Sequence, residues 1–455
     1  MFFARVLLFL YFINSCFSSS DISILRETIH FRNGVEAKNR LLKAAMSERL
    51  ASFDKDLSLR GIPNRKLINL YEKWAHGNFG MLLTGNVIVH PTHLEGGGNM
   101  VVCQENDTPE LRSWFEKLAE AMKSNGSLAV AQISDAGINT PSSIDQGPWA
   151  PSDRCKETHQ KPNSDAHVLT EEEIETLVIP RYVYTARFLY ECGFDGIELH
   201  SAPISLLSHF LSAEMNNRND SYGGSIVRRM KIFEELESNI RAALPEDTKF
   251  LVGVKIHKNL FLKDNKLMKK ECKMAARMFD KLGYDFIEVT GSSGLVGYRG
   301  NKDNNLIDQD YNDYIDEFKK RPHNYTLYLT GKFREVKKMV DALEDGRVQG
   351  IGLGRPATAE PDIADKILSG KVKTAKPNAL DEETAVVQVM AAASQIWDIA
   401  QTPYNPDDSL SSGIVDFSSE ALAGNFKNEL MKYMQKSTEM ELRLEPAVGI
   451  FHFRP

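Results

Sequence analysis

Short apolar runs along this chain alternate with longer segments in which apolar residues recur every three or four positions. Most of the runs end near a polar residue, a glycine or a lysine. Short runs without a polar face are typical of parallel strands that are buried on both sides. Eight runs therefore predict strands, and they span residues 40–46, 81–89, 128–133, 194–200, 250–256, 286–290, 325–330 and 348–353.

The segments between these runs carry signals for the starts of helices. Thr108 can cap a helix that runs to residue 121, with Pro109 at its first position. Thr170 and Glu173 form a capping-box pattern, which predicts a helix from there to Cys192. Apolar residues at helical spacing predict further helices, over residues 225–243, 266–282 and 334–343.

Strand and helix alternating eight times indicate either a closed parallel barrel or a long doubly wound sheet. No GxGxxG pattern follows the first strand, which weakens the second alternative. We therefore predict an α/β fold, a (β/α)8 TIM barrel over residues 22–375. Residues 376–455 break the alternation and predict a C-terminal helical extension, with helices at 382–399 and 425–436 and a proline-rich turn at 403–406.

The first 20 residues differ from the rest of the chain. Arg5 precedes an apolar run over residues 6–13, and three serines follow at 18–20. This layout predicts a secretory signal peptide over residues 1–20, and hence a protein of the secretory pathway or a secreted one. An uncleaved anchor and an inaccurate start of the chain are the alternatives, and the latter would leave the protein in the cytoplasm. No later segment has the length and apolar character of a membrane span, so we expect no membrane association after the leader is removed.

Composition narrows the classes of partner. Hydrophobic residues make up 42% and charged residues 26% of the chain, as in ordinary soluble enzymes. A formal net charge of -7 gives no reason to expect a nucleic acid as partner, which leaves a small molecule as the expected substrate. Beyond the leader, the cysteines Cys103, Cys155, Cys192 and Cys272 lack the spacing of metal ligands, so no metal site is expected.

Two glycine-containing turns follow the seventh and eighth predicted strands. Gly331-Lys332 and Gly354-Arg355 place exposed backbone amides and two cations at neighbouring strand ends. Barrels of this kind bind phosphate there, because glycine lets the amides approach the oxygens and the cations offset the charge. Each turn alone would be explained by a tight connection from strand to helix. Together they predict a phosphate site.

Several longer segments make the chain resemble the Old Yellow Enzyme family of flavin oxidoreductases, from about residue 39 to about residue 369. No single segment is specific, but together they are. They are NRLLKAAM at 39–46, GFDGIELH at 193–200, FLS at 210–212, NRNDSYGGS at 217–225 and GLGRP at 352–356. The resemblance implies a barrel that binds FMN, with NAD(P)H reducing the bound flavin.

The resemblance also implies roles for residues at matching positions. Gln132 would hydrogen-bond the pyrimidine edge of the flavin, and Lys255, where the family usually has arginine, would place positive charge nearby. Backbone groups of Ala44, Ala45 and Met46, at the end of the first strand, would lie against the ring, and Gly85 would lie beside it after the second strand. The phosphate would be bound by Gly331, Lys332, Gly354 and Arg355.

The substrate side departs from the family pattern. Family members that reduce activated alkenes carry a histidine, a second His or Asn three residues later, and then a tyrosine that donates a proton. Here His200 is retained, but Pro203 has no side-chain donor and Ser205 replaces the tyrosine. Asp135 and Ile138 also stand where histidine and arginine are common. His200 and Ser205 are therefore the candidate catalytic residues.

Three hypotheses follow from these residues. The first is an FMN-dependent enzyme that passes hydride from NAD(P)H through the flavin to an unidentified acceptor, an enone, a quinone or dioxygen. The second is a flavin-binding or ligand-binding pseudoenzyme that has lost ene-reductase activity. The third is a barrel without FMN that binds another phosphorylated metabolite. Retention of the flavin-side residues favours the first.

Overall fold

The computed structural model describes residues 22–155, 165–257, 260–261, 264–291, 314–319, 323–344, 346–381 and 383–455. The predicted signal peptide, residues 1–20, lies outside these ranges. In the described part of the chain, no helix is both long enough and apolar enough to span a membrane.

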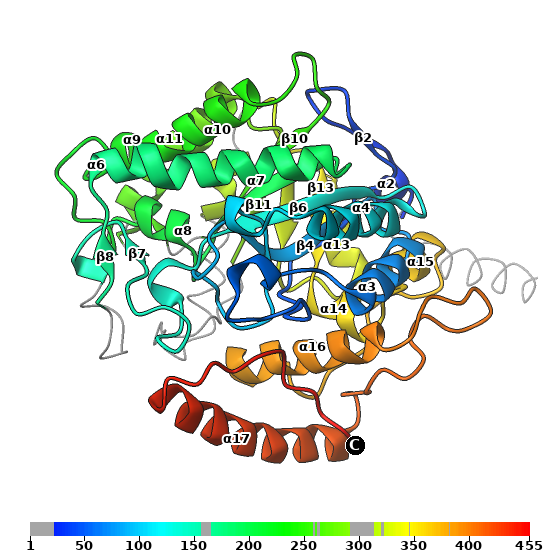
Figure 1. Ribbon diagram of the computed structural model, residues 1–455. Helices are drawn as coiled ribbons and strands as arrows, with labels where there is room; N and C mark the ends of the chain where they lie inside the picture. The colour runs from blue at the N-terminus through cyan, green and yellow to red at the C-terminus, as the bar shows by residue number, and fades with distance from the viewer. Residues whose placement is uncertain are drawn as a thin grey trace, which may run out of the picture.

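Parallel strands form the centre of the molecule (Figure 1). Each pairs with its neighbours in parallel, and the last strand, β13, pairs with the first, β3, which in turn pairs with β4. The ring is therefore closed, which confirms the predicted (β/α)8 TIM barrel. Its strands are β3 (Leu41–Lys43), β4 (Met81–Ile88), β6 (Leu128–Ser134), β9 (Gly196–Ser201), β10 (Leu251–His257), β11 (Phe286–Thr290), β12 (Thr326–Thr330) and β13 (Gly350–Leu353). A short ninth strand, β5 (Met100–Val101), pairs with the end of β4.

Helices surround the strands, and two predicted starts are observed. The hydroxyl of Thr108 accepts from the backbone N–H of Leu111 at 3.1 Å, with Pro109 at the first helical position. Thr170 and Glu173 form the predicted capping box, with bonds of 2.8 and 3.1 Å. The outer helices are α3 (Arg65–His76), α4 (Pro109–Lys123), α6 (Glu171–Glu173), α7 (Ile179–Glu191), α8 (Leu206–Leu211), α9 (Ile226–Arg229), α10 (Lys231–Ala242), α11 (Asn265–Leu282), α13 (Val336–Leu343), α14 (Arg355–Ala359) and α15 (Ile363–Leu368).

Some boundaries differ from the prediction. A π-helical turn, η4 (Ile174–Val178), separates α6 from α7. The segment predicted as one helix over 225–243 is divided at Met230 into α9 and α10. Helix α3 was not predicted, although Asn64 caps it by accepting from the N–H of Lys66. Apolar periodicity gives the faces of helices but not the breaks within them.

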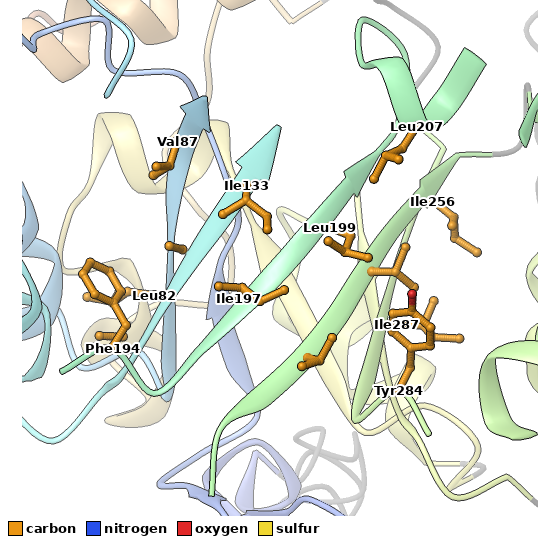
Figure 2. Close-up of a cluster of buried hydrophobic side chains, with 14 of the residues drawn as sticks. Leu82, Val87, Ile133, Phe194, Ile197, Leu199, Leu207, Ile256, Tyr284 and Ile287 are labelled. Atoms are coloured by element: carbon orange, nitrogen blue, oxygen red, sulfur yellow. The ribbon is translucent and has the colours of Figure 1, made fainter. Parts of the chain in front are cut away.

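The hydrophobic core has two layers, inside and outside the strands. Figure 2 shows part of the outer layer, where side chains from β4, β6, β9, β10 and β11 meet the surrounding helices. Inside the barrel, Leu42, Val130, Leu251, Phe286 and Tyr328 fill the space between the strands. A hairpin of β1 (Ile29–His30) and β2 (Glu36–Ala37) adds apolar side chains to this inner cluster. Because side chains alternate along a strand, the next inward positions toward the C-terminal ends form the floor of the barrel mouth.

The C-terminal segment lies against one side of the barrel (Figure 1). Helix α16 (Ala385–Ala400) packs on α3 and α14, and α17 (Glu420–Leu442) packs on α16. Residues 403–405 between them are irregular, as the two nearby prolines predict. A separate apolar cluster, which includes Phe417, Phe426 and Phe451, joins the two helices to the C-terminal end of the chain.

Candidate active site

Four polar side chains meet inside the barrel, just below its mouth. Gln132 on β6 and Glu198 on β9 are neighbours across the sheet, and the Gln132 Nε2 donates to Glu198 Oε2 at 2.6 Å. Lys255 on β10 is paired with Glu288 on β11, and its Nζ lies 3.3 Å from Glu288 Oε2. We call these four residues the inner polar cluster. It brings together Gln132 and Lys255, both predicted as cofactor ligands, and adds two glutamates that were not predicted.

His200 lies two residues beyond Glu198 on β9, so both side chains point into the barrel. Its Nδ1 lies 3.0 Å from the hydroxyl of Ser134, which ends β6. Burial and the nearby Lys255 ammonium lower the pKa of His200 to about 3. The imidazole is therefore neutral at physiological pH.

The turn that follows β9 is strained and does not present Ser205. Ile204 has φ of +77°, an unusual conformation for a β-branched residue. Ser205 is fully buried and caps α8: its hydroxyl donates to the carbonyl of Ala202 at 2.9 Å and accepts from the N–H of Ser208 at 3.3 Å. Pro203 and Ile204 are only partly buried. The hydroxyl of Ser205 thus has local structural partners.

Beyond β3 the chain runs past the middle of β4, where the register with β6 shifts between Leu83 and Asn86 and a glycine is required. The backbone N–H of Gly85 donates to Glu48 Oε1 at 2.7 Å and to the hydroxyl of Tyr71 at 3.0 Å. A Cβ at Gly85 would lie 2.3 Å from Glu48 Oε2 and 2.5 Å from the carbonyl oxygen of Met46. Gly85 therefore permits the close approach of the chain that carries Met46, Ala44 and Glu48.

A buried lysine next to this region was also not predicted. Lys43, at the end of β3, faces outward, where its Nζ donates to the carbonyl of Leu83 at 2.8 Å. The ammonium lies 4.0 Å from the ring centroid of Trp74 and 5.0 Å from that of Tyr71. Burial lowers the pKa of Lys43 to about 7, although the charge of Glu48 opposes this.

The ends of β12 and β13 carry the predicted phosphate residues. Gly331 and Lys332 both have positive φ, +124° and +59°, and turn the chain after β12. A Cβ at Gly352 would lie 1.8 Å from the hydroxyl of Thr330, so the neighbouring strands approach closely there. Gly354 precedes Arg355 at the start of α14, and Lys332 is exposed. These residues converge at two adjacent strand ends, as the sequence predicts.

Arg355 shares a carboxylate with a second arginine. The Nη1 of Arg355 lies 3.8 Å from Asp381 Oδ1 and also contacts Gln388 of α16. The second arginine is Arg334, whose Nε lies 2.7 Å from Asp381 Oδ2. Burial lowers the pKa of Arg355, which Asp381 partly offsets. Arg334 was not predicted as a site residue, although it lies two residues after Lys332 in the same turn.

Two histidines stack in the segment that follows β4. The rings of His90 and His93 have centroids 3.6 Å apart, and both meet Trp149 edge-on at 4.8 Å. His93 Nδ1 lies 2.8 Å from Asp135 Oδ2. Burial would raise the pKa of Asp135, but His93 and His90 lower it overall. No group of three or more histidines, cysteines or acids among the described residues is placed to hold a metal ion.

Comparison with known proteins identifies this barrel. The model of the NADH:flavin oxidoreductase / NADH oxidase family matches residues 25–374. The chain belongs to this family. Among curated proteins, the NADH-dependent flavin oxidoreductase nadA of Aspergillus parasiticus is 36% identical over 403 residues, which is 86% of this chain and 89% of that protein. The NADH oxidase of Thermoanaerobacter brockii is 30% identical over 339 residues, 73% of this chain and 49% of that protein.

Solved structures agree on the fold. Morphinone reductase superposes with a TM-score of 0.63 at 17% identity and covers 86% of this chain and 95% of its own. The old yellow enzyme from Trypanosoma cruzi gives a TM-score of 0.63 at 16% identity and covers 78% of this chain and 94% of its own. The resemblance to the Old Yellow Enzyme family is thus confirmed, and the protein is a flavin oxidoreductase that uses FMN and NADH. The hypotheses of a pseudoenzyme and of a barrel without FMN find no support in these relatives.

The polar groups at the mouth fit FMN. Gln132 and Lys255 offer an amide and an ammonium on one side of the barrel, which suit the polar edge of a flavin. Lys332 and Arg355 offer cations for a phosphate at the ends of β12 and β13. The buried hydroxyl of Thr330 between these ends has no hydrogen-bond partner among the described residues. A phosphorylated ligand at this place would supply one.

Proposed function

We propose that this protein uses NADH to reduce a small quinone through FMN held at the C-terminal end of the barrel. Bound FMN would supply the chemistry of accepting a hydride from nicotinamide and passing two electrons to the acceptor. The chain's own residues would bind and polarise FMN, NADH and the quinone. The observation that supports this proposal most directly is that His200 presents a buried, neutral imidazole at the inner rim of the mouth.

The cofactor residues divide into two groups. Gln132 and Lys255 would bind the pyrimidine edge, since they lie at inward positions of β6 and β10. Backbone groups of Ala44, Ala45, Met46 and the Gly85 region would lie beside the ring. The phosphate would be bound at the opposite side of the barrel, by Gly331, Lys332, Gly354 and Arg355.

His200 would donate a hydrogen bond to an oxygen of the acceptor. If the hydroxyl of Ser134 donates to Nδ1, the ring proton is on Nε2, which is then the donor. Because burial keeps the imidazole neutral, this donor is present across the physiological pH range. A quinone fits this single donor, since its two oxygens can take up protons from water after electron transfer.

An enone fits the site less well. Its reduction requires a proton on carbon, and no acid stands in the place of the missing tyrosine. Pro203 has no donor, and Ser205 is buried as the cap of α8. We therefore assign no catalytic role to Ser205. Losing one donor to a developing negative oxygen costs roughly 10²–10³ in rate, and losing the proton donor costs about 10² more.

Anaerobic stopped-flow absorbance tests this proposal. NADH should bleach the bound flavin, and the reduced enzyme should then be mixed with a benzoquinone, with 2-cyclohexenone or with dioxygen. We expect the benzoquinone to reoxidise the flavin fastest, and His200→Ala to slow this step by about 10²-fold without changing flavin content. Faster reoxidation by the enone, or an unchanged rate in His200→Ala, would contradict the assignment.

A further inference from the structure

The inner polar cluster holds more negative than positive charge. Glu198 and Glu288 are both fully buried, and Lys255 is the cation paired with Glu288. His200 also faces the barrel here and is neutral, and His257, at the next inward position after Lys255 on β10, is buried as well. Lys43 interacts with this cluster only through space, from the outer side of β3. Two carboxylates and one ammonium would leave an uncompensated negative charge inside a closed barrel, which is costly.

Hydrogen-bond accounting identifies where the imbalance lies. An ionised carboxylate can only accept. Glu198 Oε2 accepts from Gln132, but Glu198 Oε1 and both oxygens of Glu288 are buried with no hydrogen-bond partner among the described residues. The side chains of Glu198 and Glu288 are nevertheless close enough to interact directly. The Lys255 ammonium, 3.3 Å from Glu288 Oε2, can serve that oxygen. Glu198 Oε1 and Glu288 Oε1 are left as acceptors without a donor, which indicates a missing hydrogen.

We propose that Glu198 carries a proton on Oε1 and donates it to Glu288, so that the two glutamates act as one acid that positions Gln132 and Lys255. With this proton every group has a partner. Glu198 Oε2 is then the carbonyl oxygen that accepts from Gln132, and Glu288 is the ionised member that faces both the Glu198 hydroxyl and Lys255. The added proton cancels the uncompensated negative charge, so the cluster as a whole becomes neutral.

The electrostatic environment agrees with this assignment. Burial and the neighbouring Glu288 raise the pKa of Glu198 well above its usual range. Like charges held together in a site of low dielectric cannot both ionise. Gln132 offers its amide to Glu198 whether that residue is ionised or neutral, so the proton is needed to satisfy Oε1 rather than Oε2.

The shared proton would act on the bound FMN through Gln132 and Lys255. This consequence rests on the proposed function. The Nε2 of Gln132 is bound to Glu198, which leaves its carbonyl oxygen free to accept from a ligand. Lys255 lies 3.3 Å from Glu288, so its field at the mouth is partly offset. Glu198 and Glu288 are in this sense positioning residues for the two flavin ligands.

Infrared difference spectroscopy of the protein without FMN tests the proton itself. We expect a protonated carboxyl band that shifts in D2O, is present in the wild type and is absent in Glu198→Gln. Glu271→Gln is the matched control, since Glu271 is a buried carboxylate paired with Arg229 at 2.7 Å outside the barrel interior. This control should keep the band. A wild type without such a band, or a band that remains in Glu198→Gln, would overturn the proposal.

The midpoint potential of bound FMN gives a second, independent readout. Glutamine at 198 is neutral, accepts from Gln132 and donates to Glu288, so Glu198→Gln should leave the potential unchanged. Glu288→Gln removes a real negative charge beside Lys255 and should raise it. A rise in both variants would mean that Glu198 is ionised and would overturn the proposal. If the protein fails to bind FMN at all, the proposed function fails, but the infrared result still decides whether Glu198 carries a proton.

Discussion

Arg334 binds Asp381 through two contacts, with Nε 2.7 Å from Oδ2 and Nη2 2.8 Å from Oδ1. Arg334 follows the seventh barrel strand, whereas Asp381 belongs to the C-terminal segment. The same carboxylate lies 3.8 Å from Arg355, one of the residues proposed to bind phosphate. A residue from outside the barrel thus neutralises part of the positive charge at the phosphate end of the site.

We predict that Asp381→Asn tightens FMN binding. Removing the carboxylate leaves two guanidinium groups for the dianionic phosphate, and about 1 kcal/mol of added attraction corresponds to a roughly fivefold lower Kd. The effect should weaken as salt is raised. Fluorescence titration of the apoprotein with FMN at two ionic strengths measures both.

A carboxylate elsewhere in the extension provides the control. Asp416 lies 2.9 Å from Lys376 Nζ, and neither belongs to the phosphate residues. Asp416→Asn should therefore leave the Kd for FMN unchanged. Weaker binding in Asp381→Asn would mean that the carboxylate orients the arginines rather than competing for them.

The sequence predicted the barrel well because its strands are buried on both faces. Seven of the eight strands have bounds within two residues of the predicted runs, and only the first run, 40–46, extends further, beyond the end of β3 at Lys43. Local capping chemistry likewise located Thr108 and Thr170 as helix starts. The break at Met230 was missed because no strong local signal marks it, and helix α3 was missed although Asn64 caps it. Helix α17 extends beyond the predicted 425–436 on both sides.

Apart from the phosphate residues, which the two glycine-containing turns predict, the site was predicted only where it resembles the family. Gln132, Lys255 and His200 were singled out, but their partners were not, because a hydrogen bond across strands depends on register and on which face each residue occupies. A signal was present: Glu198 and Glu288 are glutamates inside otherwise apolar strands. A charge at such a position requires a partner. Asp381 could not be found this way, since its contact with Arg334 spans 47 residues.

Ser205→Ala should separate a helix cap from a catalytic hydroxyl. Loss of the cap should lower the free energy of unfolding by about 1 kcal/mol. The rate of flavin reoxidation by benzoquinone should stay the same, because the hydroxyl is buried on Ala202 and Ser208. Urea unfolding and stopped-flow absorbance measure the two effects. A tenfold loss of rate at unchanged stability would restore a catalytic role to Ser205.

Pro203→His should increase enone reduction. Pro203 lies three residues after His200 in a partly buried turn, so an imidazole there would supply a second donor to the substrate oxygen. Since one such donor is worth roughly 10²–10³ in rate, we expect at least a tenfold gain with 2-cyclohexenone. Val227→His, at an exposed residue outside the mouth, is the control. An equal rate in both variants would contradict the proposed gap in the site.

Lys43→Met should destabilise the protein by about 3 kcal/mol, because it leaves Glu48 buried without its cation. The double variant Lys43→Met with Glu48→Met should lose less than the sum of the two single variants. Tyr71 and the N–H of Gly85 hold Glu48 as well, so the coupling measures the charge interaction alone. Chemical denaturation of all four proteins completes the cycle, and strict additivity would mean that the two charges do not interact.

Acid should destabilise the apoprotein through two histidines. Burial, with smaller effects of Lys255 and His93 respectively, lowers the pKa of His200 and of His90 to about 3. Both are neutral in the fold, but in the unfolded chain they bind protons below about pH 6.5. Stability is therefore full above that pH and falls between about 6.5 and 3, by up to about 1.4 kcal/mol per pH unit for each residue.

Urea midpoints at pH 7 and pH 5 should differ less in His200→Asn and in His90→Asn than in the wild type. His30→Asn, which changes an exposed side chain, should keep the wild-type difference. An unchanged difference in His200→Asn would mean that this ring is already protonated at the mouth of the barrel, and a charged imidazole beside Lys255 would then require a different account of the acceptor site.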